Sequence, residues 1–141
     1  MSKKLWMGGI YLKEEGGYEI ILKSLIHYKK RLQTIHQSPE LKEAAAMFAP
    51  LLQSTARKKI PVINEVKEKM EQCLLNLIPV QSLEQDLEVL QKALECRKAD
   101  IIKAEETGAK YFINLLEDVH KAKKDLDQIE KALIKINQYS E

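Results

Sequence analysis

The sequence is poor in the residues that interrupt a helix. Its 141 residues include five glycines and four prolines, and four of the glycines stand before residue 18. Breakers this sparse after residue 17 favour long helices over the many short turns of a strand-rich fold. We therefore expect an all-α protein, and its length fits a single domain.

The sequence also has few cysteines and a small net charge. Cys73 and Cys96 stand apart, without the CxxC spacing of a redox or metal motif, so we expect two buried, reduced thiols rather than a disulfide. The 23 basic and 21 acidic residues leave a net charge of only +2. A balance this even predicts no strong field toward nucleic acid or an anionic membrane.

Long apolar runs are also missing. No run reaches the roughly 18 residues of a membrane-spanning helix. Lys3 and Lys4 are not followed by the apolar region of about 7–15 residues that a signal peptide needs. These absences predict a chain without a membrane span and a cytoplasmic location, with leaderless secretion as the open alternative.

Beyond residue 17 the apolar residues recur with a helical period. We expect a first helix over residues 18–37 and a second that begins near Ser38 and Pro39. Pro50 and Pro61 fall within or beside the apolar stripes of the second helix, which predicts kinks and a break at Pro61. The stripe of the first helix consists of Tyr18, Ile21, Leu25, Tyr28, Leu32 and Ile35.

A turn around Pro79 leads into a third helical region. Ser82 and Gln85 have capping-box spacing, and from Ser82 to Gln138 the one helix breaker is Gly108. We predict one continuous helix, about 85 Å long at roughly 1.5 Å per residue. A break at Gly108 is the alternative.

These elements predict an antiparallel helical bundle over residues 18–141. It has three long helices, the second kinked at proline, and a break at Gly108 would give a four-helix up-down bundle. We expect residues 1–17, which are rich in glycine and aromatic residues, to form a separate arm. The arm either covers an open end of its own bundle or docks on a partner, with Trp6 and Tyr11 as anchors.

The apolar seam of the third helix is the predicted contact surface. The first two helices look too short to cover it, so we expect a non-enzymatic assembly or adaptor module that binds a protein partner or a second copy of itself. No catalytic residue, cofactor or small-molecule substrate is indicated. The seam residues are Phe112, Leu115, Val119, Leu126, Ile129, Leu133 and Ile136.

Two alternatives come from other functional classes. Glu117 and His120 are three residues apart, as in the Glu-x-x-His motif of ferritin-like metal enzymes. That site needs a second copy of the motif, which the sequence lacks, so we predict no metal ligands. Short basic clusters at residues 29–31, 57–59 and 121–124 would allow weak nucleic-acid binding, but no aromatic residues interleave with them to stack bases.

Overall fold

The structure is a computed structural model of the chain, and it describes residues 17–35, 49–75 and 77–140. Within these ranges every regular element is a helix, which confirms the predicted all-α class. The predicted arm lies outside the described residues except for Gly17, and so do its anchors Trp6 and Tyr11.

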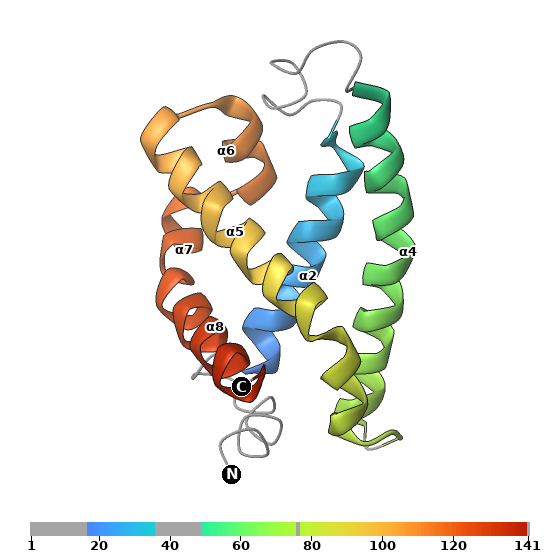
Figure 1. The fold of residues 1–141 in the computed structure, drawn as a ribbon. Helices are drawn as coiled ribbons and strands as arrows, with labels where there is room; N and C mark the ends of the chain where they lie inside the picture. Colours follow the sequence, from blue (N-terminus) through green and yellow to red (C-terminus); the bar gives the residue numbers. More distant parts are fainter. Residues whose placement is uncertain (1–16, 36–48, 76, 141) are drawn as a thin grey trace.

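The helices form an up-down bundle of four columns (Figure 1). In this view α2 runs upward, α4 returns downward on the right, and α5 rises obliquely across the front of α2. The last column descends on the left as three shorter helices. The elements are α2 (Tyr18–Gln33), α4 (Ala49–Leu74), the 3-10 helix η2 (Val80–Asp86), α5 (Leu87–Thr107), α6 (Lys110–Leu116), α7 (Val119–Lys123) and α8 (Leu126–Ser140).

Helix α2 is the central column because two of its faces are covered. It packs against both α4 and α5. Ile21 and Leu25, from the predicted stripe, are fully buried, while Ser24, His27 and Arg31 are buried as well. The helix begins at Tyr18 as predicted and ends at Gln33, four residues earlier than predicted.

Helix α4 continues through Pro61, so the break predicted there is wrong. Pro61 itself is exposed, and the backbone bond that it removes lies on the solvent side of the helix. Ala56, Ile63 and Val66 are buried on either side of it. Their spacing of seven and three residues keeps them on one face, so packing against α2 holds both halves in one helix.

The chain between α4 and α5 is a 3-10 helix rather than the start of a long α-helix. The Ser82 hydroxyl donates to the Pro79 carbonyl oxygen at 2.7 Å, which makes Ser82 part of this tight turn and not a helix cap. The predicted start at Ser82 is therefore wrong, and α5 begins at Leu87. Neither cysteine forms a disulfide among the described residues, and Cys73 is buried while Cys96 is half-buried.

The third helical region is broken at Gly108, so the alternative prediction is confirmed and the continuous helix is wrong. Gly108 has φ +64°, in the left-handed region, and its N–H donates to the Ala104 carbonyl at 3.0 Å. Ala109 is extended, and its N–H donates to the Thr107 hydroxyl at 3.2 Å. These two non-helical residues are enough to separate the helices, because α6 starts at Lys110, directly after Ala109.

The predicted apolar seam lies in the protein's own core. Helix α8 packs against α5 and α2, and α6 and α7 both pack against α5. The expectation that this chain leaves the seam uncovered is therefore wrong. The break at Gly108 lets the later helices fold back on α5, which covers most of the seam together with α2. Phe112, Leu115, Ile129 and Ile136 are buried, while Val119, Leu126 and Leu133 are half-buried against the same core.

Candidate functional site

A chain of polar side chains crosses the interface between α2, α5 and the turn before α8. We call it the polar network. Its charged centre is almost entirely removed from water, with Arg97 8% and Asp100 2% exposed. Buried charges persist only where partners offset the loss of hydration, so each contact of this network matters. Its members are Lys23, His27 and Arg31 from α2, Arg97 and Asp100 from α5, and Asp125 from the turn.

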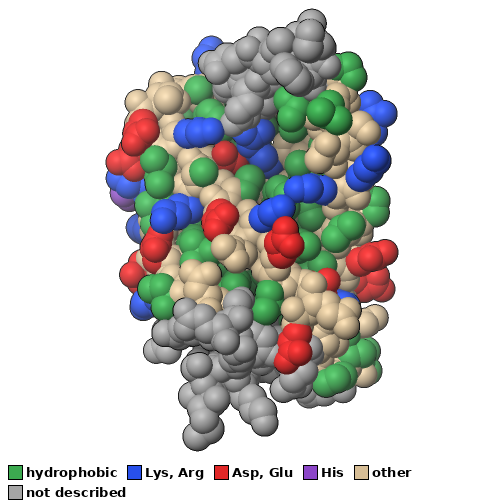
Figure 2. Space-filling model, viewed as in Figure 1, with side chains coloured by type: hydrophobic (Ala, Val, Ile, Leu, Met, Phe, Trp, Pro, Cys, Tyr) green, Lys and Arg blue, Asp and Glu red, His purple; other side chains and the backbone are tan. Residues whose placement is uncertain are grey.

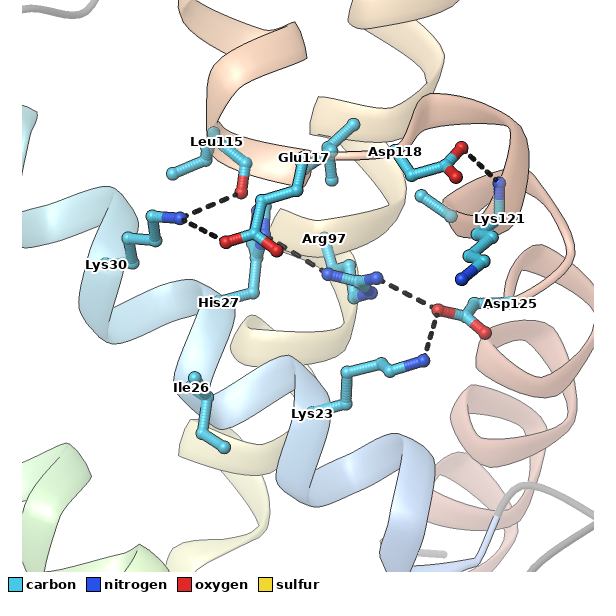
Figure 3. Close-up of a pocket in the computed structure, with 12 residues that line it drawn as sticks. Lys23, Ile26, His27, Lys30, Arg97, Leu115, Glu117, Asp118, Lys121 and Asp125 are labelled. Atoms are coloured by element: carbon cyan, nitrogen blue, oxygen red, sulfur yellow. Dashed lines mark hydrogen bonds and ion pairs between the residues drawn. The ribbon is translucent and has the colours of Figure 1, made fainter.

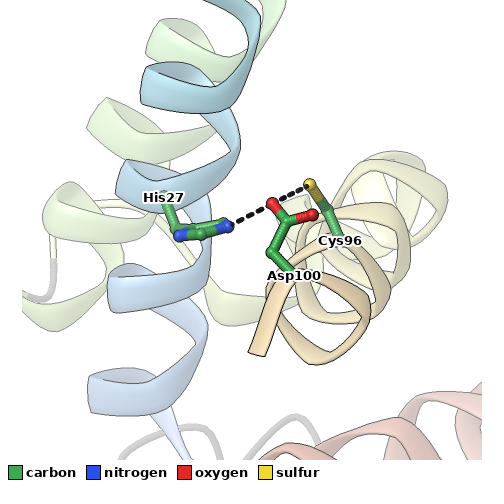
Figure 4. A group of neighbouring side chains, drawn as sticks. All are labelled: His27, Cys96 and Asp100. Carbon is green, nitrogen blue, oxygen red and sulfur yellow. Dashed lines mark hydrogen bonds and ion pairs between the residues drawn. The ribbon is translucent and has the colours of Figure 1, made fainter. Parts of the chain in front are cut away.

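Asp100 accepts hydrogen bonds from both sides of the α2–α5 interface (Figure 4). The His27 Nε2 atom lies 2.8 Å from its Oδ2 atom, and the Arg31 Nε atom donates to the same oxygen at 3.1 Å. The Cys96 thiol is a weak donor to it at 3.7 Å. The carboxylate therefore pairs with a guanidinium while orienting the imidazole.

The neighbours of His27 assign its tautomer. Arg97 can only donate, and its Nη1 atom lies 3.4 Å from His27 Nδ1, so Nδ1 has to accept. The proton then resides on Nε2, where it is donated to Asp100. Burial lowers the pKa of His27 below its ordinary 6.5, and the nearby Arg97 and Arg31 act in the same direction, against the opposing effect of Asp100. The imidazole is thus held neutral.

Arg97 connects the network to the turn before α8. Its Nη2 atom donates to Asp125 Oδ2 at 2.9 Å, and Lys23 donates to the same oxygen at 3.1 Å. The Arg97 Nε atom is buried and has no hydrogen-bond partner in the part of the chain that the structure describes. A buried donor without an acceptor costs about 1–3 kcal/mol, so this atom calls for a physical explanation.

One group in the network has the composition of a metal site. Among the described residues, His27, Cys96 and Asp100 are the three metal-ligating side chains whose ligand atoms lie within 4.8 Å of one another. However, the Nε2 atom that would bind the metal carries a proton, and two guanidiniums lie beside the group. The geometry therefore fits an internal ion pair better than a cation site.

A pocket of about 350 Å³ opens beside the network, between α2 and α7 (Figure 3). Arg97 and His27 reach it from the buried side. Lys30 enters from α2, where it contacts the Leu115 carbonyl oxygen at 3.4 Å and the Glu117 carboxylate at 3.7 Å. Part of the wall is apolar, formed by Ile26, Leu115, Leu116 and Ala122.

The rim of this pocket contains a strained turn. Glu117 has φ +66° and ψ −53°, and it is the one non-glycine with positive φ in the described residues. The Asp118 N–H donates to the Leu116 carbonyl at 2.7 Å across it. This is the rare, strained form of γ-turn. Strain of this kind gathers at functional sites.

The remaining rim residues come from α7. The Asp118 carboxylate accepts a hydrogen bond from the Lys121 backbone N–H at 3.1 Å and so caps this short helix. The Lys121 side chain lines the pocket from this helix (Figure 3). Its ammonium group has no acceptor among the described residues. The pocket thus has a lysine available for a ligand.

The residues of the two alternative functions are not arranged as those functions need. Glu117 ends α6 and His120 lies on α7, so they do not share a helix, and both are exposed. In the first basic cluster, Arg31 is buried against Asp100 and Lys30 faces Glu117. That cluster is therefore not an open basic surface.

Sequence reasoning did not identify the polar network, although a signal for it exists. Ile20, Ser24, His27 and Arg31 step by four, three and four residues, which is the spacing of a second buried stripe on α2. On α5, Arg97 interrupts an apolar stripe of the same period. The flanking members of that stripe are Leu90, Leu94, Ile101 and Ala104, all buried.

The outer side of α4 is the second surface of interest, because α4 packs mainly against α2 and η2. We call it the α4 outer face. Four of the eight large apolar side chains that are exposed in the described residues belong to α4 or the turn after it. The space-filling view shows basic side chains above acidic ones along this edge (Figure 2). The residues of the α4 outer face are Leu51, Arg57, Lys58, Val62, Glu65, Glu68, Glu71, Leu75 and Leu77.

Comparisons with protein families, curated proteins and solved structures find no match to this chain. Within the described ranges, none of the helices combines the length and the apolar character that crossing a membrane requires. The function has to follow from the geometry of the pocket and of the α4 outer face.

Proposed function

We propose that this protein is a non-enzymatic helical-bundle module that acts by protein association, and that its first partner is a second copy of itself. The contact is the α4 outer face of each copy, in antiparallel orientation. The observation that carries the proposal is the separation of opposite charges along this face, next to exposed leucines.

The charges divide the face into two halves. Arg57 and Lys58 are exposed on the half nearer the start of α4, and Glu65, Glu68 and Glu71 on the half nearer its end. A parallel pair would bring like charges together, whereas an antiparallel pair brings each basic half against an acidic half. Such self-complementarity is what a twofold-symmetric dimer requires.

The spacing of the charges matches a single twofold axis. Steps of seven or eleven residues return to the same side of a helix, so Lys58 and Glu65 share one edge of the face, and Arg57 and Glu68 the other. The midpoints of both pairs fall beside Val62. One axis near Val62 therefore aligns both ion pairs at once.

Exposed apolar residues supply the rest of the contact. Leu51 is 63% exposed near the start of α4, and Leu75 is 70% exposed just beyond its end. The same axis brings Leu51 of one copy to the level of Leu75 of the other. Burying a leucine contributes roughly 1.5–3 kcal/mol, far more than an exposed ion pair. The leucines therefore supply affinity and the charges supply orientation.

The test reverses the charges of the two halves of α4 by substitution and measures the strength of the dimer by sedimentation equilibrium. The variant Arg57→Glu/Lys58→Glu should weaken the dimer by at least about tenfold, because twofold symmetry makes each substitution act twice. Glu65→Lys/Glu68→Lys should do the same, and the combination of all four should restore association. Lys110→Glu/Lys124→Glu is the matched control, since it makes the same change in net charge on exposed residues outside α4.

Three results would overturn the proposal. One is a monomeric parent protein at all accessible concentrations. Another is an equal effect of the Lys110→Glu/Lys124→Glu control. The third is failure of the four-site variant to regain what the two double variants lose, which would mean that α4 does not pair with α4 in this orientation.

A further inference from the structure

The pocket between α2 and α7 combines features that the association of α4 does not use. Arg97 lies at its base and is more than nine-tenths buried; its Nη atoms contact His27 and Asp125, while its Nε atom has no partner among the described residues. Lys121 points toward it without an acceptor among the described residues, and Glu117 holds its rim in a strained turn.

We propose that this pocket binds a phosphate monoester with a small apolar group. The phosphate would lie between Lys30, Lys121 and Arg97, which reach the pocket from α2, α7 and α5. Cations that converge from three elements suit a tetrahedral dianion better than a planar carboxylate. The apolar group would lie against the wall that Ile26 and Leu115 provide.

The acids of the pocket leave Lys121 without a carboxylate partner among the described residues, and they engage Arg97 and Lys30 only in part. Asp118 is engaged in capping α7, and Asp125 is paired with Arg97 and Lys23 on the side toward α8. Glu117 is the remaining competitor for Lys30, at 3.7 Å. Its side chain is 83% exposed, so it can turn into water when a phosphate oxygen takes its place.

The volume of the pocket agrees with a substituted phosphate. About 350 Å³ is at the lower end of the range for small-molecule sites, and it exceeds what a bare anion fills. The apolar wall would be left facing water by inorganic phosphate alone. We therefore expect an ester to bind more tightly than the free anion.

The experiment is calorimetric titration of the full-length protein with phenyl phosphate, inorganic phosphate and benzoate. Phenyl phosphate should bind at least about tenfold more tightly than the other two, because it combines the dianion with a ring. In Lys30→Ala/Lys121→Ala, its affinity should fall by at least about tenfold. The control Lys110→Ala/Lys124→Ala removes two exposed lysines outside the pocket and should bind within about twofold of the parent.

Circular dichroism establishes that each variant is folded before titration. No detectable binding of phenyl phosphate at millimolar concentration would overturn the proposal, and so would unchanged affinity in Lys30→Ala/Lys121→Ala. Benzoate that binds as well as phenyl phosphate would show that the site does not select phosphate. The same titration of Arg57→Glu/Lys58→Glu should be unaffected, so the pocket and the dimer are tested separately.

Discussion

At the scale of single residues, the hydrogen bonds of His27 depend on its charge state. Its imidazole donates to Asp100 and accepts from Arg97 only when it is neutral. Protonation would leave the Nδ1 proton facing a guanidinium in a buried site. Burial accordingly lowers its pKa, and this lowered pKa links folding to pH.

We expect the free energy of unfolding to fall as the pH drops below about 6.5, the ordinary pKa of histidine. Below that value the unfolded chain binds a proton that the folded chain resists, so stability is complete above it and decreases toward the lowered folded pKa. The slope is at most about 1.4 kcal/mol per pH unit for one proton. Urea unfolding between about pH 5.5 and 7.5 measures it without titrating ordinary carboxyl groups.

The comparison that isolates His27 uses two histidine variants. His27→Gln keeps a donor and an acceptor but cannot be protonated, so its stability should vary less with pH than that of the parent. His120→Gln changes an exposed histidine outside the network and should keep the parent's slope. If the free energy of unfolding changed with pH equally in the parent and in His27→Gln, His27 would not be the source of the pH dependence.

The residues of the network were only partly predictable. The stripe of Ser24, His27 and Arg31 has the period of a buried face, and this signal is present in the sequence. Their partners are not readable in the same way, since His27 and Asp100 are 73 positions apart. Which residues meet across such a distance depends on how α5 crosses α2, and local spacing does not determine that crossing.

At the scale of elements, backbone conformation at single residues decides where helices end. Gly108 was a recognisable breaker because glycine adopts positive φ at little cost. The end of α6 at Glu117 had no such signal, since glutamate is a good helix former. Conversely, Pro61 signalled a break that core packing overrides. Local rules therefore offered the break at Gly108 only as the alternative to a continuous helix, and they failed at Glu117 and Pro61.

The turn at Glu117 allows a direct measurement of its strain. Glu117→Gly should raise the free energy of unfolding by about 1 kcal/mol, because glycine adopts φ +66° without the strain that a side chain brings. The exposed Lys30–Glu117 ion pair that is lost contributes little. Urea denaturation gives the difference.

The control for this change is a glycine in an ordinary helical position. Asn114→Gly, on an exposed site of α6, should lower stability by about 0.5–1 kcal/mol. Glycine would then have opposite effects at two positions three residues apart. A loss of stability at both positions would mean that the turn at Glu117 is not strained.

At the scale of the whole molecule, burial distinguishes the apolar residues of the core from those of the surface that we propose as a contact. The residues of the predicted seam are covered by this chain's own helices, while exposed leucines gather on and just after α4. Periodicity alone does not distinguish the two cases, because a stripe looks the same whether its cover comes from the same chain or another. In this chain the break at Gly108 decides that the stripe is covered by the chain's own helices.

The proposed α4-mediated dimer would make the stability of the protein depend on its own concentration. Association stabilises the folded chain by mass action, so the thermal midpoint should rise between about 1 and 100 μM protein. Because exposed charges orient the contact, added salt should reduce this rise, as the screening length falls from about 10 Å at 0.1 M to about 3 Å at 1 M. Scanning calorimetry over both variables tests this. Arg57→Glu/Lys58→Glu should show a smaller rise than the parent protein over the same range, because its dimer is weaker. A parent protein whose midpoint does not change with concentration would contradict the proposed α4 dimer.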